Sequence, residues 1–237
     1  MLVNNELSNI YPIPEIKKAI KAAGSPALLH TDAVQGYLKM PIGVSSLGAD
    51  LITLSAHKIH GPKGCGALYV KGGANTIHPC IFGGGQENNL RSGTENTPAI
   101  AGFGQAVKTA EAGLEQRMIK LKELKEYTTS LLTGNGCGAV INSPGENSAP
   151  HILNISMPGL KSEVVLNDLD ANDIYVSSGS ACSSRKKTTS HVLAAAGFTK
   201  QEADSSIRIS FGDFNEKKDC ERLAECLKKC RGTLFSV

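Results

Sequence analysis

The sequence predicts an α/β fold, and three observations lead to that prediction. Short apolar runs recur along the chain, helix-forming or loop segments separate them, and a long stretch rich in Ala, Glu, Lys and Leu lies near the middle. Such alternation is typical of sheets whose strands are joined by helices. The chain has 237 residues, 41% of them hydrophobic and 20% charged, so it is long enough to bury a sizeable core.

The first part of the chain predicts one helix and three strands. A helix is expected over residues 13–23, because prolines stand at its start, where they are tolerated, and Gly24-Ser25-Pro26 stops it. Short apolar runs predict strands at 27–30, 49–54 and 66–70.

A long helix is expected next, from 97 to 132, and Asn135-Gly136 ends it. It would carry the chain out of the first domain, so we place one domain at 1–115 and a second at 116–237. Within the second domain the patterns predict helices at 162–170, 191–196 and 216–229, and strands at 151–157, 174–176 and 207–211. The alternation in 151–157 is typical of a half-buried strand.

Composition and charge exclude several classes of protein. The net charge is +3 and the strongest basic cluster is short, at 185–187, whereas a nucleic-acid footprint is normally larger and more continuous. No run approaches the roughly 20 apolar residues of a membrane helix, and the start of the chain lacks the pattern of a signal peptide. Seven cysteines fit no disulfide framework, which predicts free thiols in a reducing cytoplasm.

Asp32 and Lys58 each follow an apolar, strand-like run. Ligands of open α/β sheets bind beyond the carboxyl ends of the strands, so these two side chains are expected at one rim. Pyridoxal phosphate (PLP) needs such a pair, because the lysine bonds the aldehyde and the acid keeps the pyridine nitrogen protonated. The alternative to a cofactor site is that Lys58 is an ordinary surface lysine and Asp32 an ordinary aspartate at the end of a strand.

Cys182 lies in a stretch of small polar residues and glycine, 177–184, which predicts an accessible loop. A thiol in such a loop can reach a substrate, and the nearby Arg185 and Lys186 would favour the thiolate. An ordinary loop cysteine is the alternative.

Cys220, Cys226 and Cys230 lack the paired spacing of a metal site. Cys226 and Cys230 share one face of a predicted helix, which favours packing in the core. We expect no metal.

Residues 55–64, SAHKIHGPKG, closely resemble the PLP-lysine motif of the NifS/IscS-like cysteine desulfurases, in the class V aminotransferase superfamily. Other segments resemble this family in the same order: 3–6, 30–35, 83–87, 91–96, 177–182 and 206–210. The resemblance implies part of a PLP-dependent transferase type I large domain, with a mixed, mostly parallel sheet. A smaller α/β domain carrying the catalytic-cysteine loop would follow.

The resemblance also implies roles for single residues. Lys58 resembles the Schiff-base lysine that moves the substrate α-proton, and Cys182 the cysteine that becomes a persulfide. The other implied cofactor ligands are Asp32 for the pyridine nitrogen, Gln35 for the phenolic oxygen, Ser55 and His57 for the phosphate, Asn5, and Thr94, lent to a partner subunit. Arg208, with Asn5, would bind the substrate carboxylate, to which a guanidinium is suited.

The implied activity removes sulfur from L-cysteine, giving L-alanine and a persulfide on Cys182. The persulfide would pass to an iron–sulfur scaffold or a tRNA-thiolation protein, and the role of Thr94 implies a homodimer.

The chain departs from the family at its N-terminus, where it begins at what resembles the middle of the large domain. The resemblance implies a truncated member without the aromatic residue that stacks on PLP and the Gly/Thr loop that binds its phosphate. Leu7-Ser8 also stands where the family usually has Ile-Gly. An inactive remnant acting through protein interaction, one half of a split enzyme and a selenocysteine lyase-like relative are the alternatives.

Overall fold

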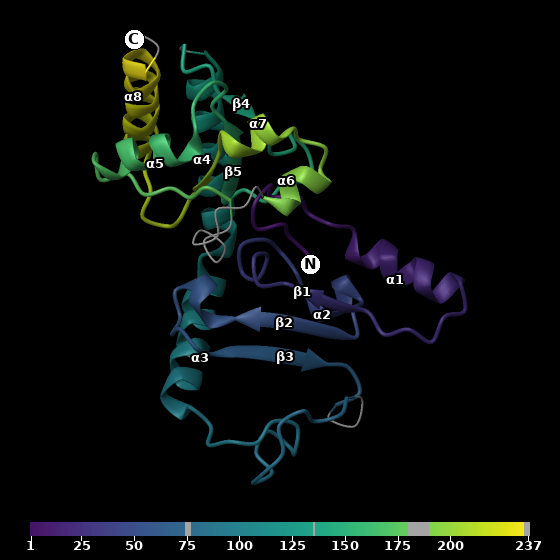
Figure 1. Cartoon of the computed structure of the whole chain (residues 1–237). Helices are drawn as coiled ribbons and strands as arrows, with labels where there is room; N and C mark the ends of the chain where they lie inside the picture. The colour runs from purple at the N-terminus through teal and green to yellow at the C-terminus, as the bar shows by residue number, and fades with distance from the viewer. Residues whose placement is uncertain (74–76, 135, 180–189, 235–237) are drawn as a thin grey trace. The chain divides into compact units, whose positions relative to one another are not determined.

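The structure, a computed structural model, describes residues 1–73, 77–134, 136–179 and 190–234 (Figure 1). The chain forms two compact units. The first comprises Met1–Val3 and Tyr11–Leu114, and the second comprises Asn4–Ile10 and Glu115–Val237. The assignment of one domain to PLP binding and another to the catalytic cysteine remains a prediction.

The first unit contains a three-stranded sheet in the order β1-β2-β3. Its elements are α1 (Ile13–Ala22), β1 (His30–Asp32), α2 (Val44–Leu47), β2 (Leu51–Ser55), the 3₁₀ helix η1 (Ala56–Ile59), β3 (Gly66–Val70) and α3 (Thr97–Ala112). A small core joins α3 to η1 and β2, with Phe103, Ala56 and Ile59 buried and Leu54 packed against them. This core fixes the chain that follows β2.

The expected mostly parallel sheet is not what the described residues form. β1 pairs with β2 in parallel, but β2 pairs with β3 antiparallel. Parallel strands need a crossover of about a dozen residues or more, usually a helix. Between Ser55 and Gly66 the chain forms only η1 and a turn, so it reverses direction. The first strand also begins later than expected, at His30, where its pairing with β2 starts, and Leu28 is 54% exposed.

The second unit contains an antiparallel sheet in the order β4-β5-β6. Its elements are α4 (Leu114–Gly134), β4 (Val140–Ile141), β5 (Ile152–Ser156), α5 (Ser162–Asp170), α6 (His191–Ala195), α7 (Lys200–Asp204), β6 (Ser206–Ser210) and α8 (Lys217–Leu234). Leu153, Ile155 and Ile207 lie in one large core with buried leucines of α4, α5 and α8.

Three expectations for the second half of the chain are corrected. The long helix is two helices that meet at Gly113, a residue that weakens a helix interior. No strand forms at 174–176 among the described residues, since Ile174 donates its amide to Leu169 O and so closes α5. β5 is buried along its whole length, and its polar residues Asn154 and Ser156 accept hydrogen bonds from Asn142 there.

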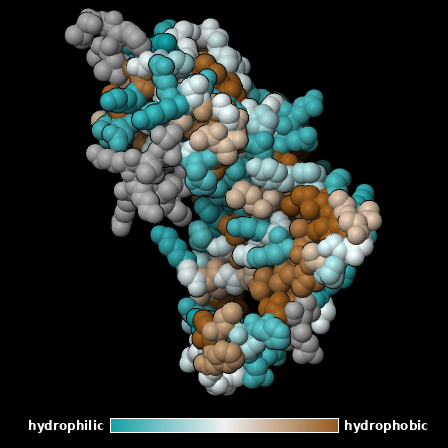
Figure 2. Space-filling model, turned by 45° about the vertical axis from the view of Figure 1, so that its right-hand side comes forward, coloured by the Kyte–Doolittle hydropathy of each residue, from teal (hydrophilic) through white to brown (hydrophobic). Residues whose placement is uncertain are grey.

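Hydrophobic residues gather on one face of the first unit, in the lower half of Figure 2. The exposed large apolar side chains of this unit include Leu28, Val44 and Leu68. Contiguous exposed apolar surface is typical of protein interfaces. Along the described ranges, every helix is too short or too polar to cross a membrane.

Candidate active site

The first unit places Asp32 and Ser55 on the same face of its sheet. Asp32 is the register partner of Thr53 in the parallel pair β1–β2, and Ser55 lies two residues further along β2. Side chains alternate between the faces of a strand, so Asp32, Thr53 and Ser55 share one face. The two parallel strands therefore end side by side at the rim where the sequence predicts ligand binding.

Lys58 and His57 follow directly from β2. Ser55 ends the strand and forms the N-cap of η1, which contains both residues. The Ser55 hydroxyl lies 2.7 Å from His57 Nδ1, so a hydroxyl and an imidazole meet at the end of the strand. His57 is exposed and Lys58 half-buried, which leaves both within reach of a ligand.

A tight turn after β1 holds Asp32 and Gln35. The amide of Val34 donates to Asp32 Oδ1 at 2.9 Å, and the amide of Gly36 donates to Ala33 O. Gln35 is half-buried in this turn. The bond from Val34 holds the carboxylate at the end of the strand, and the bond from Gly36 closes the turn.

Thr94 is exposed in the loop that leads into α3. Gln86 Oε1 accepts a hydrogen bond from the amide of Gly93, and the side chain of Asn96 caps α3. The loop is thus held on both sides of Thr94.

These residues fit PLP by their chemistry. A carboxylate suits a protonated ring nitrogen, a lysine amine suits an aldehyde, and a hydroxyl beside an imidazole suits a phosphate. Asp32, Lys58, Ser55 and His57 supply these groups within one unit, at the ends of two paired strands. The predicted cofactor residues of the first unit therefore form a chemically consistent set.

In the second unit, Arg208 and Asn5 are in contact. Arg208 lies on β6 and its Nη1 donates to the backbone oxygen of Asn5 at 3.0 Å. The backbone of Arg208 pairs with Ser177 in both directions. Cys182, the predicted nucleophile, lies outside the described residues.

No role was predicted for Glu6 from the sequence, yet its side chain is a buried carboxylate, 3% exposed, beside Asn5. Ser190 Oγ donates to Glu6 Oε2 at 2.6 Å. The segment 3–6 carries part of the family resemblance, so the signal was present, but no pattern in the sequence connects Glu6 with Ser190.

Cys220, Cys226 and Cys230 pack in the core of the second unit. Burial raises the pKa of Cys230 to about 11, with a further contribution from the carboxylate of Asp168, and burial also raises the pKa of Cys220. A protonated buried thiol is unreactive, so these residues serve the packing of the core, as the sequence predicts.

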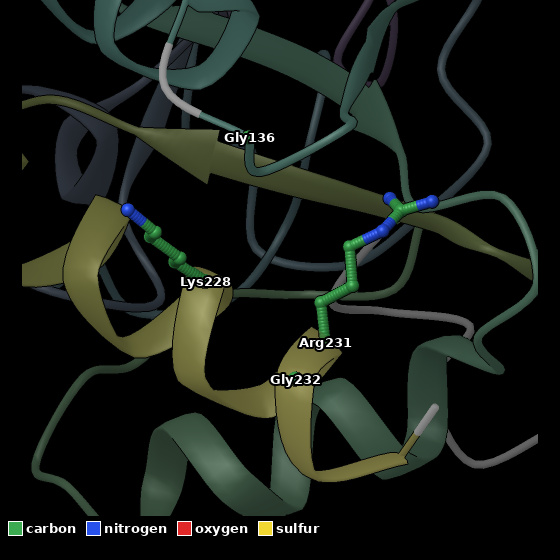
Figure 3. A pocket seen from close by; sticks show the side chains of 4 residues that line it. All are labelled: Gly136, Lys228, Arg231 and Gly232. Atoms are coloured by element: carbon green, nitrogen blue, oxygen red, sulfur yellow. The ribbon is translucent and has the colours of Figure 1, made fainter. Parts of the chain in front are cut away.

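One cavity, of about 390 Å³, lies at the end of α8, lined by Gly136, Lys228, Arg231 and Gly232 (Figure 3). Arg231 Nη1 donates to the carbonyls of Cys137 and Gly138. The predicted site residues are not among those that line it.

The family model for class V aminotransferases matches residues 1–223. The chain is 39% identical over 229 residues to the cysteine desulfurase IscS of Dictyoglomus turgidum, covering 97% of this chain and 57% of that protein. It is 38% identical over 226 residues to the putative cysteine desulfurase IscS 1 of Bacillus subtilis, covering 95% of this chain and 59% of that protein.

Solved structures of NifS-like proteins are also similar to this chain. A NifS-like protein from Rickettsia africae superimposes with a TM-score of 0.88 at 36% identity, covering 98% of this chain and 60% of that one. Another NifS-like protein gives a TM-score of 0.89 at 34% identity, with the same coverage. The chain thus spans 57% to 60% of the length of these relatives.

Proposed function

The chain belongs to the class V aminotransferase family, and from this premise we propose that it acts as a PLP-dependent cysteine desulfurase. The observation that carries the proposal is the placement of Asp32, Ser55, His57 and Lys58 at the ends of two paired strands in one unit. The similarity to desulfurases of the IscS and NifS type supports cysteine as the substrate.

Each residue would act through ordinary proton and anion chemistry. Asp32 would accept a hydrogen bond from the pyridine N–H, and Ser55 and His57 would bind the phosphate. Gln35 would donate to the phenolic oxygen, and Asn5 would bind beside it. PLP held in this site would supply an electron sink for the charge that develops at the substrate α-carbon.

Lys58 and Cys182 would carry out the transfer. Lys58 Nζ, a free amine once L-cysteine is bound, would take the proton from the α-carbon of L-cysteine, whose carboxylate Arg208 would bind. The Cys182 thiolate would attack the substrate sulfur, forming an S–S bond as the substrate C–S bond breaks. L-Cysteine and the Cys182 thiol would yield L-alanine and a Cys182 persulfide. An acceptor protein, an iron–sulfur scaffold or a tRNA-thiolation protein, would then take the outer sulfur.

A PLP titration of the purified chain tests the proposal. We expect a saturable visible absorption band that is lost in Lys58→Ala, because the band requires the bond to that amine. Lys63→Ala is the matched control, since Lys63 is an exposed lysine of the same motif, and it should keep the band.

Sulfide release from L-cysteine, with a thiol reductant added to cleave the persulfide, is the second step of this test, and Cys182→Ala should abolish it while the absorption band stays. A chain that gives no band, or whose band survives Lys58→Ala, would contradict the proposed function.

A further inference from the structure

We propose that Glu6 is a positioning residue that holds Ser190 beside Gly179, the two described residues that flank the Cys182-containing segment 180–189. The proposal rests on the proposed function, because it concerns the placement of the nucleophile. It is carried by contacts among Glu6, Gly179 and Ser190, all of them described residues of the second unit.

Glu6 contacts the chain on both sides of this segment. On the C-terminal side, Ser190 Oγ donates to Glu6 Oε2 at 2.6 Å. On the N-terminal side, a Cβ added to Gly179 would lie 3.3 Å from the same oxygen, and Gly179 has a φ of +75°. A side chain at position 179 would therefore be strained and would crowd the carboxylate. One carboxylate oxygen thus accepts a hydrogen bond from Ser190 and lies close to the place that a side chain at position 179 would take.

Neighbouring bonds hold Glu6 in place. Asn4 Oδ1 accepts hydrogen bonds from the amides of Glu6 and Leu7, both at 2.9 Å. Leu7 packs in a small core with Leu193, in α6, directly after Ser190. The position of the carboxylate is therefore set by its own segment and does not depend on Ser190 alone.

Ser190 transmits the contact into α6. It is the N-cap of this helix, and its Oγ also accepts a hydrogen bond from the amide of Leu193. On the other side, Ser177 exchanges two backbone hydrogen bonds with Arg208, whose side chain binds Asn5 O. Residues 5 and 6 thus hold both ends of the segment through separate contacts.

The burial of Glu6 supports a role for its charge. Removing a carboxylate from water is costly unless hydrogen bonds compensate, and a charge-assisted bond is about twice as strong as a neutral one. A glutamine would keep the shape of the side chain and lose this advantage. Glu6→Gln is therefore the informative substitution.

Hydrogen exchange of the full chain tests the proposal without needing the cofactor. In Glu6→Gln we expect the amides of Leu193 and Ala194, which donate to Ser190, to exchange about tenfold faster, because the lost charge-assisted bond lowers the free energy of local opening. The amide of Ile155, in the middle of β5, should not change. Glu221→Gln is the matched control, because Glu221 also accepts a 2.6 Å bond from a hydroxyl, that of Tyr127.

A second pair of variants separates this role from simple loss of stability. Ser190→Ala removes the hydroxyl and should reproduce the effect of Glu6→Gln, whereas Ser190→Thr keeps a hydroxyl and should restore slow exchange. In the PLP-loaded chain, Glu6→Gln should lower kcat for persulfide formation and leave KM for L-cysteine unchanged.

Two results would overturn the proposal: unchanged exchange at Leu193 and Ala194 in Glu6→Gln, or an unchanged kcat despite faster exchange. Failure of the proposed function looks different, because a chain that binds no PLP can still show the exchange response. If the chain binds PLP and Glu6→Gln changes neither hydrogen exchange nor kcat, the result would contradict the positioning role alone.

Discussion

Lys125 is a half-buried lysine whose amine joins two loops of the second unit. Its Nζ donates to Ser148 Oγ at 2.6 Å and to Ala149 O at 2.9 Å, and it lies 3.4 Å from Ser8 Oγ. Burial lowers the pKa of Lys125 to about 8 from 10.5. The folded chain therefore releases this proton at a lower pH than the unfolded chain does.

This shift predicts a pH dependence of stability. Between about pH 8 and 10.5 the unfolded state binds more protons at this site, so the free energy of unfolding rises with pH there. Relative to Lys125→Met, the wild-type chain should gain about 1–2 kcal/mol across this range, after allowance for partial solvent screening. Urea unfolding at several pH values measures the difference, and parallel curves for the two proteins would contradict the assignment.

The sequence predicted the chemistry of single residues where these residues belong to one motif. Lys58, His57 and Ser55 stand within four positions of one another, and the structure places them at the end of one strand. The contact of Glu6 with Ser190 was not readable, because it joins residues 184 positions apart. The role of Cys182 remains a prediction, because this residue lies outside the described part of the chain.

At the scale of elements, the pairing of β2 with β3 determines the position of Ser55. Ser55 is the register partner of Gly66, and a Cβ at Gly66 would lie 2.7 Å from the backbone oxygen of Leu54. Gly66→Ala should push the strands apart, destabilise the chain by about 1–3 kcal/mol and weaken PLP binding. Thermal unfolding and PLP titration measure the two effects.

Gly104→Ala is the control for this prediction. Gly104 lies in α3, and an added Cβ meets nothing within 4 Å, so the substitution should stabilise the helix by about 0.5–1 kcal/mol. Equal effects of the two glycine substitutions would show that crowding at Leu54 O is not the cause.

Elements with strong local signals were predictable, and short ones were not. The strand at 66–70 and the helix at 162–170 agree with β3 and α5. α2, α7 and β4 were missed, because a few residues carry too little periodicity to register. The direction of β3 depends on the length of the connection before it. The pattern of apolar residues does not predict strand direction.

At the scale of the whole molecule, the implied homodimer makes a specific prediction. If Thr94 serves the cofactor of a partner subunit, one site of a Lys58→Ala/Thr94→Ala heterodimer has both side chains intact. Mixing and reassembling these two variants should therefore restore PLP absorption to about a quarter of the wild-type level, since half of randomly formed dimers are mixed. Absorption equal to the average of the separate variants would exclude a shared site, and sedimentation would report the dimer itself.

The path of the chain between its two units has one more consequence. The chain leaves the first unit after Val3, returns at Tyr11 and leaves again after Leu114. A single cut after Leu114 would leave Asn4–Ile10 on the wrong fragment, although Leu7 belongs to the core around Leu193. The second unit is therefore not a module that recombination could exchange in one piece. A chimera between relatives would have to carry two separated stretches of coding sequence.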